Sequence, residues 1–222
     1  MKRSQATRSR PLAIADQVVK WLGTLALLGT ALITFATHHN YETLASLASL
    51  AILWLAHTVI RRIFPGEQRH GLLIAIDLYL VEAGIMGTVL NFYNSIPFYD
   101  KINHGVVGIL AAVIGLLFFY RLNPEQRNQL TVRPGFVAIF CLGFAMTYKV
   151  FWEFYEFSGD RLFNTNMQRW QASGLNGLID TMLDLAFGMA FAGVVCLVIM
   201  HQLKQDADEF YQKHIRGFFE NH

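Results

Sequence analysis

Long apolar runs recur along the whole of this 222-residue chain, and they constrain its fold more than any other feature. Hydrophobic residues make up 54% of the sequence and charged residues 15%, a balance that is unusual for a soluble domain. Several runs approach the roughly 20 residues that a helix needs to cross a bilayer core about 30 Å thick. Because lipid admits only helices or closed barrels, and these runs are too long for strands, we expect an all-α, polytopic transmembrane bundle of about six helices.

Six spans are predicted from these runs, with ends defined only to within several residues. In chain order they are Val18 to Ala36, Leu44 to Ile60, Gly71 to Phe92, Ile102 to Tyr120, Gly135 to Phe157 and Asp180 to His201. The organisation expected from them is a cytoplasmic basic tail at 1–17, a six-helix membrane domain at 18–202 and a cytoplasmic amphipathic tail at 203–222. The first apolar region is longer than that of a signal peptide, so we expect it to be an anchor.

Lys and Arg alternate between the connections. The N-terminal tail, the second and fourth connections and the C-terminal tail are basic, whereas the first connection has no Lys or Arg and the third has only Lys101. The positive-inside rule therefore predicts that both termini lie in the cytoplasm. A formal net charge of +2, spread along the chain, gives no reason to expect nucleic acid as a partner. Cys141 and Cys196 lie inside apolar runs and are expected to act as small hydrophobes.

Four ionisable residues lie deep within the predicted spans, where each needs a partner, a water-filled cavity or a function. His57 and Asp77 lie at similar depths near the inner ends of consecutive spans, so they are expected to pair. Glu82 and Lys149 also lie at comparable depths. They form either an ion pair that locks two helices or part of a path for protons or ions.

A second set lies at the predicted outer ends of the last three spans. Its members form pairs three or four residues apart, so each pair shares one face of its helix. The topology deduced from Lys and Arg places all three pairs within about one turn of the same boundary. The sequence therefore predicts one site. The pairs are Asp100 with His104, Glu153 with Glu156, and Asp180 with Asp184.

Each pair also has a structural interpretation. Asp100 and Asp180 precede apolar runs, where a carboxylate caps a helix N-terminus and meets the positive end of its dipole. His104 also fits a lone hydrogen-bonded histidine. Glu153 and Asp184 lie one turn deeper than their partners, where no cap is needed, and this favours a functional role.

Four to five carboxylates and one imidazole suit either a divalent cation or an acid/base pair, and the spacing does not decide between them. Oxygen-rich sets with one His favour Mg²⁺ or Mn²⁺, and Zn²⁺ also fits. The expected metal ligands are His104, Glu153, Glu156, Asp180 and Asp184. The expected catalytic groups are His104, Glu153 and Asp184.

The fifth connection, Ser158 to Ile179, is the longest on the predicted outer side and would overhang this site. It is either a plain solvated loop or a lid that supplies Arg to an anionic group. The residues expected to contact a substrate are Asp100, Lys101, Arg169 and Gln171.

These motifs resemble the YjdF-like bacterial inner-membrane proteins over most of the chain, and more distantly the VanZ-like family over residues 99 to 190. The shared pattern is Asp-Lys/Arg-x-x-His, then Glu-x-x-Glu/Gln, then Asp-x-x-x-Asp/Asn followed by Gly. It is matched by Asp100, Lys101, His104, Glu153, Glu156, Asp180, Asp184 and Gly188. The resemblance implies a bacterial plasma-membrane protein. VanZ-like proteins are associated with low-level teicoplanin resistance, and YjdF-like proteins have no assigned activity.

Three functions are compatible with the sequence. The first is an envelope protein whose outward-facing site binds or processes an amphiphilic or lipid-linked molecule, with or without a divalent metal. The second is a small ion-coupled transporter in which Glu82 and Lys149 relay to the outer site. The third is a non-catalytic membrane scaffold whose charged pairs lock helices together. The sequence does not decide whether the protein is an enzyme, nor does it indicate an oligomeric state.

Overall fold

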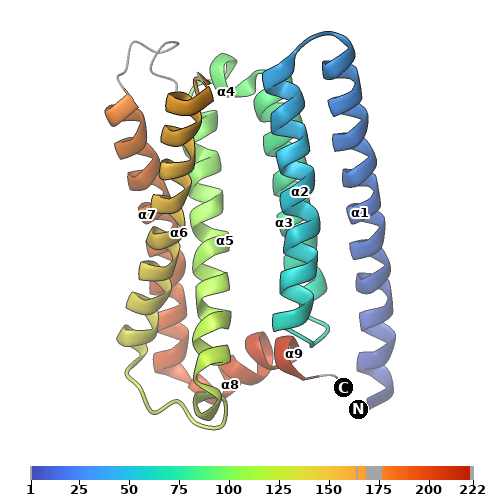
Figure 1. Cartoon of the computed structure of the whole chain (residues 1–222). Helices are drawn as coiled ribbons and strands as arrows, with labels where there is room; N and C mark the ends of the chain where they lie inside the picture. The colour runs from blue at the N-terminus through green and yellow to red at the C-terminus, as the bar shows by residue number, and fades with distance from the viewer. Residues whose placement is uncertain (1, 164, 169–176, 221–222) are drawn as a thin grey trace. The chain divides into compact units, whose positions relative to one another are not determined.

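A computed structural model describes residues 2–163, 165–168 and 177–220, and over these ranges the chain is helical with no strand (Figure 1). Six helices are long and apolar enough to cross a membrane. The predicted all-α bundle of about six spans is therefore confirmed. The spans are Pro11–Ala36, Asn40–Ile63, Arg69–Val89, Tyr99–Leu122, Pro134–Leu162 and Gly177–Gln205.

The chain divides into two compact units. Unit 1 consists of Met1–Ser95 together with Gln212–His222, and unit 2 consists of Ile96–Tyr211. Unit 1 is therefore built from two segments that are far apart in the sequence, whereas unit 2 is continuous.

Unit 1 is a bundle of three packed helices, α1 (Lys2–Ala36), α2 (Asn40–Ile63) and α3 (Arg69–Val81). The helix that begins as α3 continues as a π-helix, η1 (Glu82–Val89), and is followed by the single turn α4 (Phe92–Ser95). The apolar core takes one leucine from each long helix, so α1 packs as an integral part of the unit. These leucines are Leu27, Leu53 and Leu80.

The C-terminal tail folds onto the connection between α2 and α3. It contains η3 (Tyr211–Ile215) and α9 (Arg216–Phe219). The backbone N–H of Gly66 donates to the carbonyl of Phe218 at 2.8 Å. A Cβ atom at Gly66 would lie 2.2 Å from the carbonyl oxygen of Gly217, so only glycine permits this approach. The tail thus lies at the end of unit 1 where α2 ends and α3 begins.

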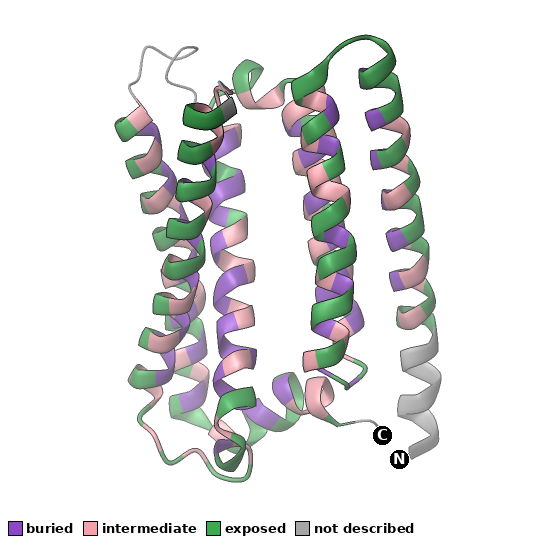
Figure 2. Ribbon diagram, in the orientation of Figure 1, coloured by how far each residue is buried: buried purple, intermediate pink, exposed green. Residues whose placement is uncertain are grey.

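Unit 2 is a second three-helix bundle, formed by α5 (Tyr99–Leu122), α6 (Pro134–Phe163) and α7 (Gly177–Gln205). The 3₁₀ turn η2 (Pro124–Arg127) and the short α8 (Ala207–Phe210) complete it. Buried residues run along most of α5 (Figure 2). The middle of the bundle is apolar and includes both cysteines, which are unpaired and buried as expected. Its buried residues include Ala112, Leu116, Leu117, Val137, Cys141, Ala145, Ala192 and Cys196.

Two glycines allow α5 and α7 to approach closely. A Cβ atom at Gly108 would lie 2.4 Å from the carbonyl oxygen of Gly188, and one at Gly188 would lie 3.1 Å from the side chain of Lys149. Small residues at such contacts let helix backbones pack tightly in membranes. This contact lies one helical turn from His104 on α5 and from Asp184 on α7.

Candidate functional site

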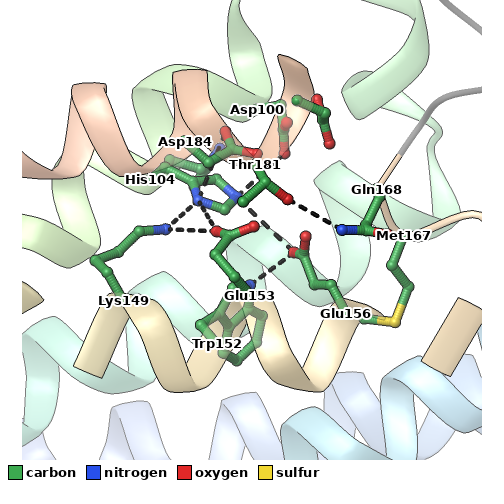
Figure 3. Close-up of polar contacts among 12 residues, drawn as sticks. Asp100, His104, Lys149, Trp152, Glu153, Glu156, Met167, Gln168, Thr181 and Asp184 are labelled. Atoms are coloured by element: carbon green, nitrogen blue, oxygen red, sulfur yellow. Dashed lines mark hydrogen bonds and ion pairs between the residues drawn. The ribbon is translucent and has the colours of Figure 1, made fainter. Parts of the chain in front are cut away.

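The three predicted pairs meet in unit 2, together with two lysines. Figure 3 shows six members of this group, Asp100, His104, Lys149, Glu153, Glu156 and Asp184. We call this group the acidic cluster. None of its eight residues is more than 8% exposed. The α5 helix supplies three residues, α6 supplies three and α7 supplies two. They are Asp100, Lys101, His104, Lys149, Glu153, Glu156, Asp180 and Asp184.

The imidazole of His104 lies at the centre of the cluster. Its Nε2 atom lies 3.6 Å from Asp100 and 3.9 Å from Glu156. Its Nδ1 atom lies 3.7 Å from Glu153 and 3.6 Å from Asp184. Nδ1 also forms a hydrogen bond with the Lys149 amine. Because an ammonium group can only donate, a charged Lys149 requires Nδ1 to accept, which leaves the ring proton on Nε2.

Lys101 joins α5 to α7. Its ammonium lies 3.0 Å from Asp100, 2.5 Å from Asp180 and 2.8 Å from Asp184. Asp100 and Asp180 also lie in the first turns of their helices, as the capping interpretation expects, but both belong to this ionic network. The ammonium of Lys101 is thus occupied by three carboxylates, and its predicted contact with a substrate stays a prediction.

The carboxylates of Glu153 and Asp184 are incompletely satisfied. Within the described part of the chain, the oxygens of Glu153 and Oδ2 of Asp184 are buried without a well-formed hydrogen bond, whereas Oδ1 of Asp184 lies 2.8 Å from the Lys101 ammonium. The neighbours of Glu153 are the Lys149 ammonium at 3.5 Å, the His104 ring at 3.7 Å and the side chain of Thr181. A buried polar group without a hydrogen bond costs about 1–3 kcal/mol. These two residues are the ones that the sequence singled out as too deep for capping.

Two sets of three side chains in the cluster have the geometry of metal ligands. They are Asp100 with His104 and Asp184, and Glu153 with Glu156 and Asp184; in each set the ligand atoms lie within 4.8 Å of one another. Asp184 belongs to both sets. Asp180, a predicted ligand, belongs to neither and instead binds Lys101. Asp100, which the sequence predicted as a substrate contact and not as a metal ligand, belongs to the first of these sets.

Sequence reasoning missed the environment of Lys149. It assigned Lys149 and Glu82 to either an ion pair or a path for protons or ions, but Glu82 lies in unit 1, and both interpretations stay predictions. In unit 2, Lys149 contacts His104 and Glu153. The spacing of four residues between Lys149 and Glu153 is the signal that could have revealed the second contact. The indole of Trp152 also donates to Glu156 at 2.7 Å.

The start of the fifth connection folds over the same end of unit 2. The carboxylate of Asp160 accepts hydrogen bonds from the hydroxyl of Thr165 at 2.7 Å and from the backbone N–H groups of Met167 and Gln168 at 2.7 and 3.0 Å. The side chain of Gln168 then donates to Thr181 of α7 at 3.0 Å. The predicted substrate contacts Arg169 and Gln171 lie outside the described residues.

Asp160→Asn should loosen this segment. The new amide keeps one acceptor oxygen, but its NH₂ group faces the N–H of either Met167 or Gln168, and two donors repel. Loss of a hydrogen bond to a charged group costs about 1.5–3 kcal/mol. We therefore expect amide exchange of Met167 and Gln168 to accelerate roughly 10-fold or more in hydrogen–deuterium exchange. Asp206→Asn, which alters a cap in α8, should leave these amides unchanged; equal exchange in both variants would contradict the role of Asp160.

These features define a polytopic helical membrane protein with a buried polar cluster between three helices. The chain belongs to the family described as "Predicted membrane protein (DUF2238)", whose model matches residues 19–205. The matched range includes the whole acidic cluster.

A relative from Thermotoga maritima, described as an uncharacterized protein, is 33% identical over 124 residues. The match covers 55% of this chain and 57% of the relative, so the chain spans little more than half the length of this relative. No solved structure matches the chain.

Proposed function

We propose that this protein is a multi-pass protein of the bacterial plasma membrane that binds a divalent cation in the acidic cluster. Through this cation it binds the anionic head group of an envelope or lipid-linked amphiphile. The observation that carries the proposal is the composition of the cluster. Five buried carboxylates face two lysines, so the cluster would carry an excess of three negative charges with every carboxylate ionised and His104 neutral.

An uncompensated buried charge is costly, because the desolvation of each ion is not repaid by a partner. A divalent cation supplies two positive charges and offers ligand positions to the incompletely satisfied carboxylates of Glu153 and Asp184. The donor set is rich in oxygen, which suits Mg²⁺ or Mn²⁺, and one imidazole also admits Zn²⁺. A cation held in this way keeps coordination positions for a phosphate or carboxylate ligand.

The position of the cluster supports an amphiphile as the ligand. The distribution of Lys and Arg predicts that this end of unit 2 lies at the outer surface, where lipid head groups lie. Arg161 is exposed at the same end, with its guanidinium 5.5 Å from the ring of Phe157, and is available to an anionic group. Membership of the DUF2238 family agrees with the resemblance to YjdF-like proteins. The more distant VanZ-like resemblance stays a prediction.

A transporter is less well supported. A proton or ion path through unit 2 would need polar groups between the acidic cluster and the opposite, basic end. Residues 105–119, 135–148 and 185–200 contain no Asp, Glu, Lys, Arg or His, and the described side chains at the centre of the bundle are packed and apolar. A relay through Glu82, which lies in the other unit, is a separate hypothesis.

A scaffold function also uses a buried ionic network, and cation binding distinguishes the two. The test uses the full chain purified in dodecyl maltoside, with Mn²⁺ binding followed by electron paramagnetic resonance. We expect the wild type to bind Mn²⁺ and Glu153→Gln to bind it at least about 10-fold more weakly, because a metal ligand is removed. Glu125→Gln, the same change at an exposed position in η2, should bind Mn²⁺ like the wild type.

A second arm tests the head group. Dodecyl phosphate added with Mn²⁺ should raise the melting temperature of the wild type more than Mn²⁺ alone, and should have no such effect on Glu153→Gln. If Mn²⁺, Mg²⁺ and Zn²⁺ all bind equally to the wild type and to Glu153→Gln, the cation site is refuted. If Mn²⁺ binds as expected but dodecyl phosphate adds nothing, the amphiphile is refuted and the cation site remains.

A further inference from the structure

Unit 1 contains its own group of buried ionisable side chains, which the acidic cluster and the proposed function do not involve. The predicted pair of His57 and Asp77 is confirmed, with Nε2 of the imidazole 2.8 Å from the carboxylate. Two further residues join the pair: Asp16 from α1 and His70 from the first turn of α3. Their exposed fractions are 0% for Asp16, 2% for His57, 8% for His70 and 0% for Asp77.

The two oxygens of Asp16 have different environments. Its Oδ2 atom accepts hydrogen bonds from Nδ1 of His70 at 2.6 Å and from the guanidinium of Arg61 at 2.8 Å. Its Oδ1 atom lies 3.8 Å from Nε2 of His57 and has no hydrogen-bond partner among the described residues. The carboxylate of Asp16 is therefore fixed on one side, while its other oxygen is directed at the His57 ring.

Three donor atoms converge beside that oxygen. Asp16, His57 and Asp77 each offer one ligand atom, and these atoms lie within 4.8 Å of one another. Ligands about 2.0–2.1 Å from a tetrahedral ion lie about 3.4 Å apart. The distances from Nε2 of His57 to Asp77 and to Asp16, 2.8 and 3.8 Å, bracket this value. The three side chains are thus placed to bind one ion with little movement.

The charges and the unpartnered atoms also favour an ion. Asp16 and Asp77 each bury one oxygen that lacks a hydrogen bond within the described chain, at a cost of about 1–3 kcal/mol for each atom. Lys20, one turn after Asp16, directs its ammonium to the ring of Trp54, 3.5 Å from the centroid. A divalent ion would balance the charge of Asp77 and bind the free oxygen of Asp16, whose other oxygen is paired with the partly exposed Arg61 at 2.8 Å.

We propose that Asp16, His57 and Asp77 bind a divalent transition metal ion, with Zn²⁺ as the best match to a mixed imidazole and carboxylate set. His70 and Arg61 are positioning residues, because they hold Asp16 without touching the ion. Three protein ligands leave one coordination position for water or a further ligand. The Lys and Arg of the connection after α2 predict that this end of unit 1 faces the cytoplasm.

The test measures Zn²⁺ affinity and stoichiometry on the full chain in detergent. Asp77→Asn should weaken Zn²⁺ binding by about 100-fold or more, since a ligand is lost. His70→Gln should weaken it by about 10- to 100-fold, the usual effect of an outer-sphere partner, with the same stoichiometry at saturation. Glu42→Gln, an acid-to-amide control near the far end of α2, should bind like the wild type.

A second readout identifies the histidine without a variant. Zn²⁺ should slow hydrogen exchange at the imidazole C2 position of His57 in the wild type, as measured by mass spectrometry of its peptide. It should do so equally in Glu153→Gln, which separates this site from the acidic cluster. Exchange at His57 that ignores Zn²⁺, or an Asp77→Asn protein that folds and binds Zn²⁺ like the wild type, overturns the proposal. Loss of Mn²⁺ binding at the acidic cluster has no bearing on it.

Discussion

Lys149→Met is expected to destabilise unit 2 by roughly 3–5 kcal/mol, the range measured when one partner of a buried ion pair is removed. Lys149 is 1% exposed and contacts both His104 and Glu153. Methionine preserves most of the aliphatic stem that packs against Gly188, so the loss of stability reports on removal of the charge rather than on lost packing. The excess of negative charge in the cluster would rise by one. The measurement is equilibrium unfolding in mixed micelles of dodecyl maltoside and dodecyl sulfate.

Two comparisons make this result interpretable. Lys204→Met, the same change at an exposed position near the end of α7, should shift stability by less than about 0.5 kcal/mol. Adding Glu153→Gln to Lys149→Met should recover part of the loss, because the uncompensated carboxylate is then removed as well. A loss below about 1 kcal/mol for Lys149→Met would mean that the ionic network described here does not form.

Gly108→Ala should be comparably damaging for a steric reason. The added methyl group meets the backbone carbonyl of Gly188 at 2.4 Å, and a backbone cannot rotate away as a side chain can. The helices α5 and α7 must separate, which typically costs about 1–3 kcal/mol or more in a packed interior. For a chain of this size we expect the melting temperature to fall by roughly 5 °C or more.

The same change should impair the site. His104 precedes Gly108 by one turn, and Asp184 precedes Gly188 by one turn. Loss of the contact between the two glycines would therefore disturb the 3.6 Å separation of the His104 ring and the Asp184 carboxylate. Gly143→Ala is the matched control, because a Cβ atom there meets nothing within 4 Å. It should leave the melting temperature unchanged or raise it, since Ala favours helix over Gly by about 1 kcal/mol. Equal melting temperatures for both variants would contradict the close approach.

The acidic cluster was predictable because two independent patterns point to it. The spacing of Asp180 and Asp184 fixes a shared helix face, and the alternation of Lys and Arg fixes which helix ends lie together. The fold was predictable for a similar reason, since a bilayer requires long apolar helices. Most spans extend beyond the predicted bounds, as the fifth does by ending at Leu162 rather than Phe157, whereas the third is shorter and finishes at Val89 in a π-helix rather than at Phe92.

The contacts that the sequence did not predict depend on how each helix is rotated about its axis. The sequence alone does not specify that rotation. Asp16 fell within the polar tail predicted at 1–17, yet its partners Arg61 and His70 lie 45 and 54 residues further along the chain. A hint was present, because His57 and Arg61 are four residues apart and share a face. The choice between Glu82 and Glu153 as the partner of Lys149 could not be made from depth alone.

The arrangement of unit 1 also sets an order on biosynthesis. Its three long helices leave the ribosome first, but the segment that covers Phe64, with ring centroids 6.2 Å from Phe218 and 5.6 Å from Phe219, is made only after all of unit 2. Until then the connection after α2 lacks the backbone partner that Gly66 later acquires. The contact between the two segments of unit 1 therefore forms late in translation, and a ribosome stalled within α7 would hold α1, α2 and α3 without the segment that covers Phe64.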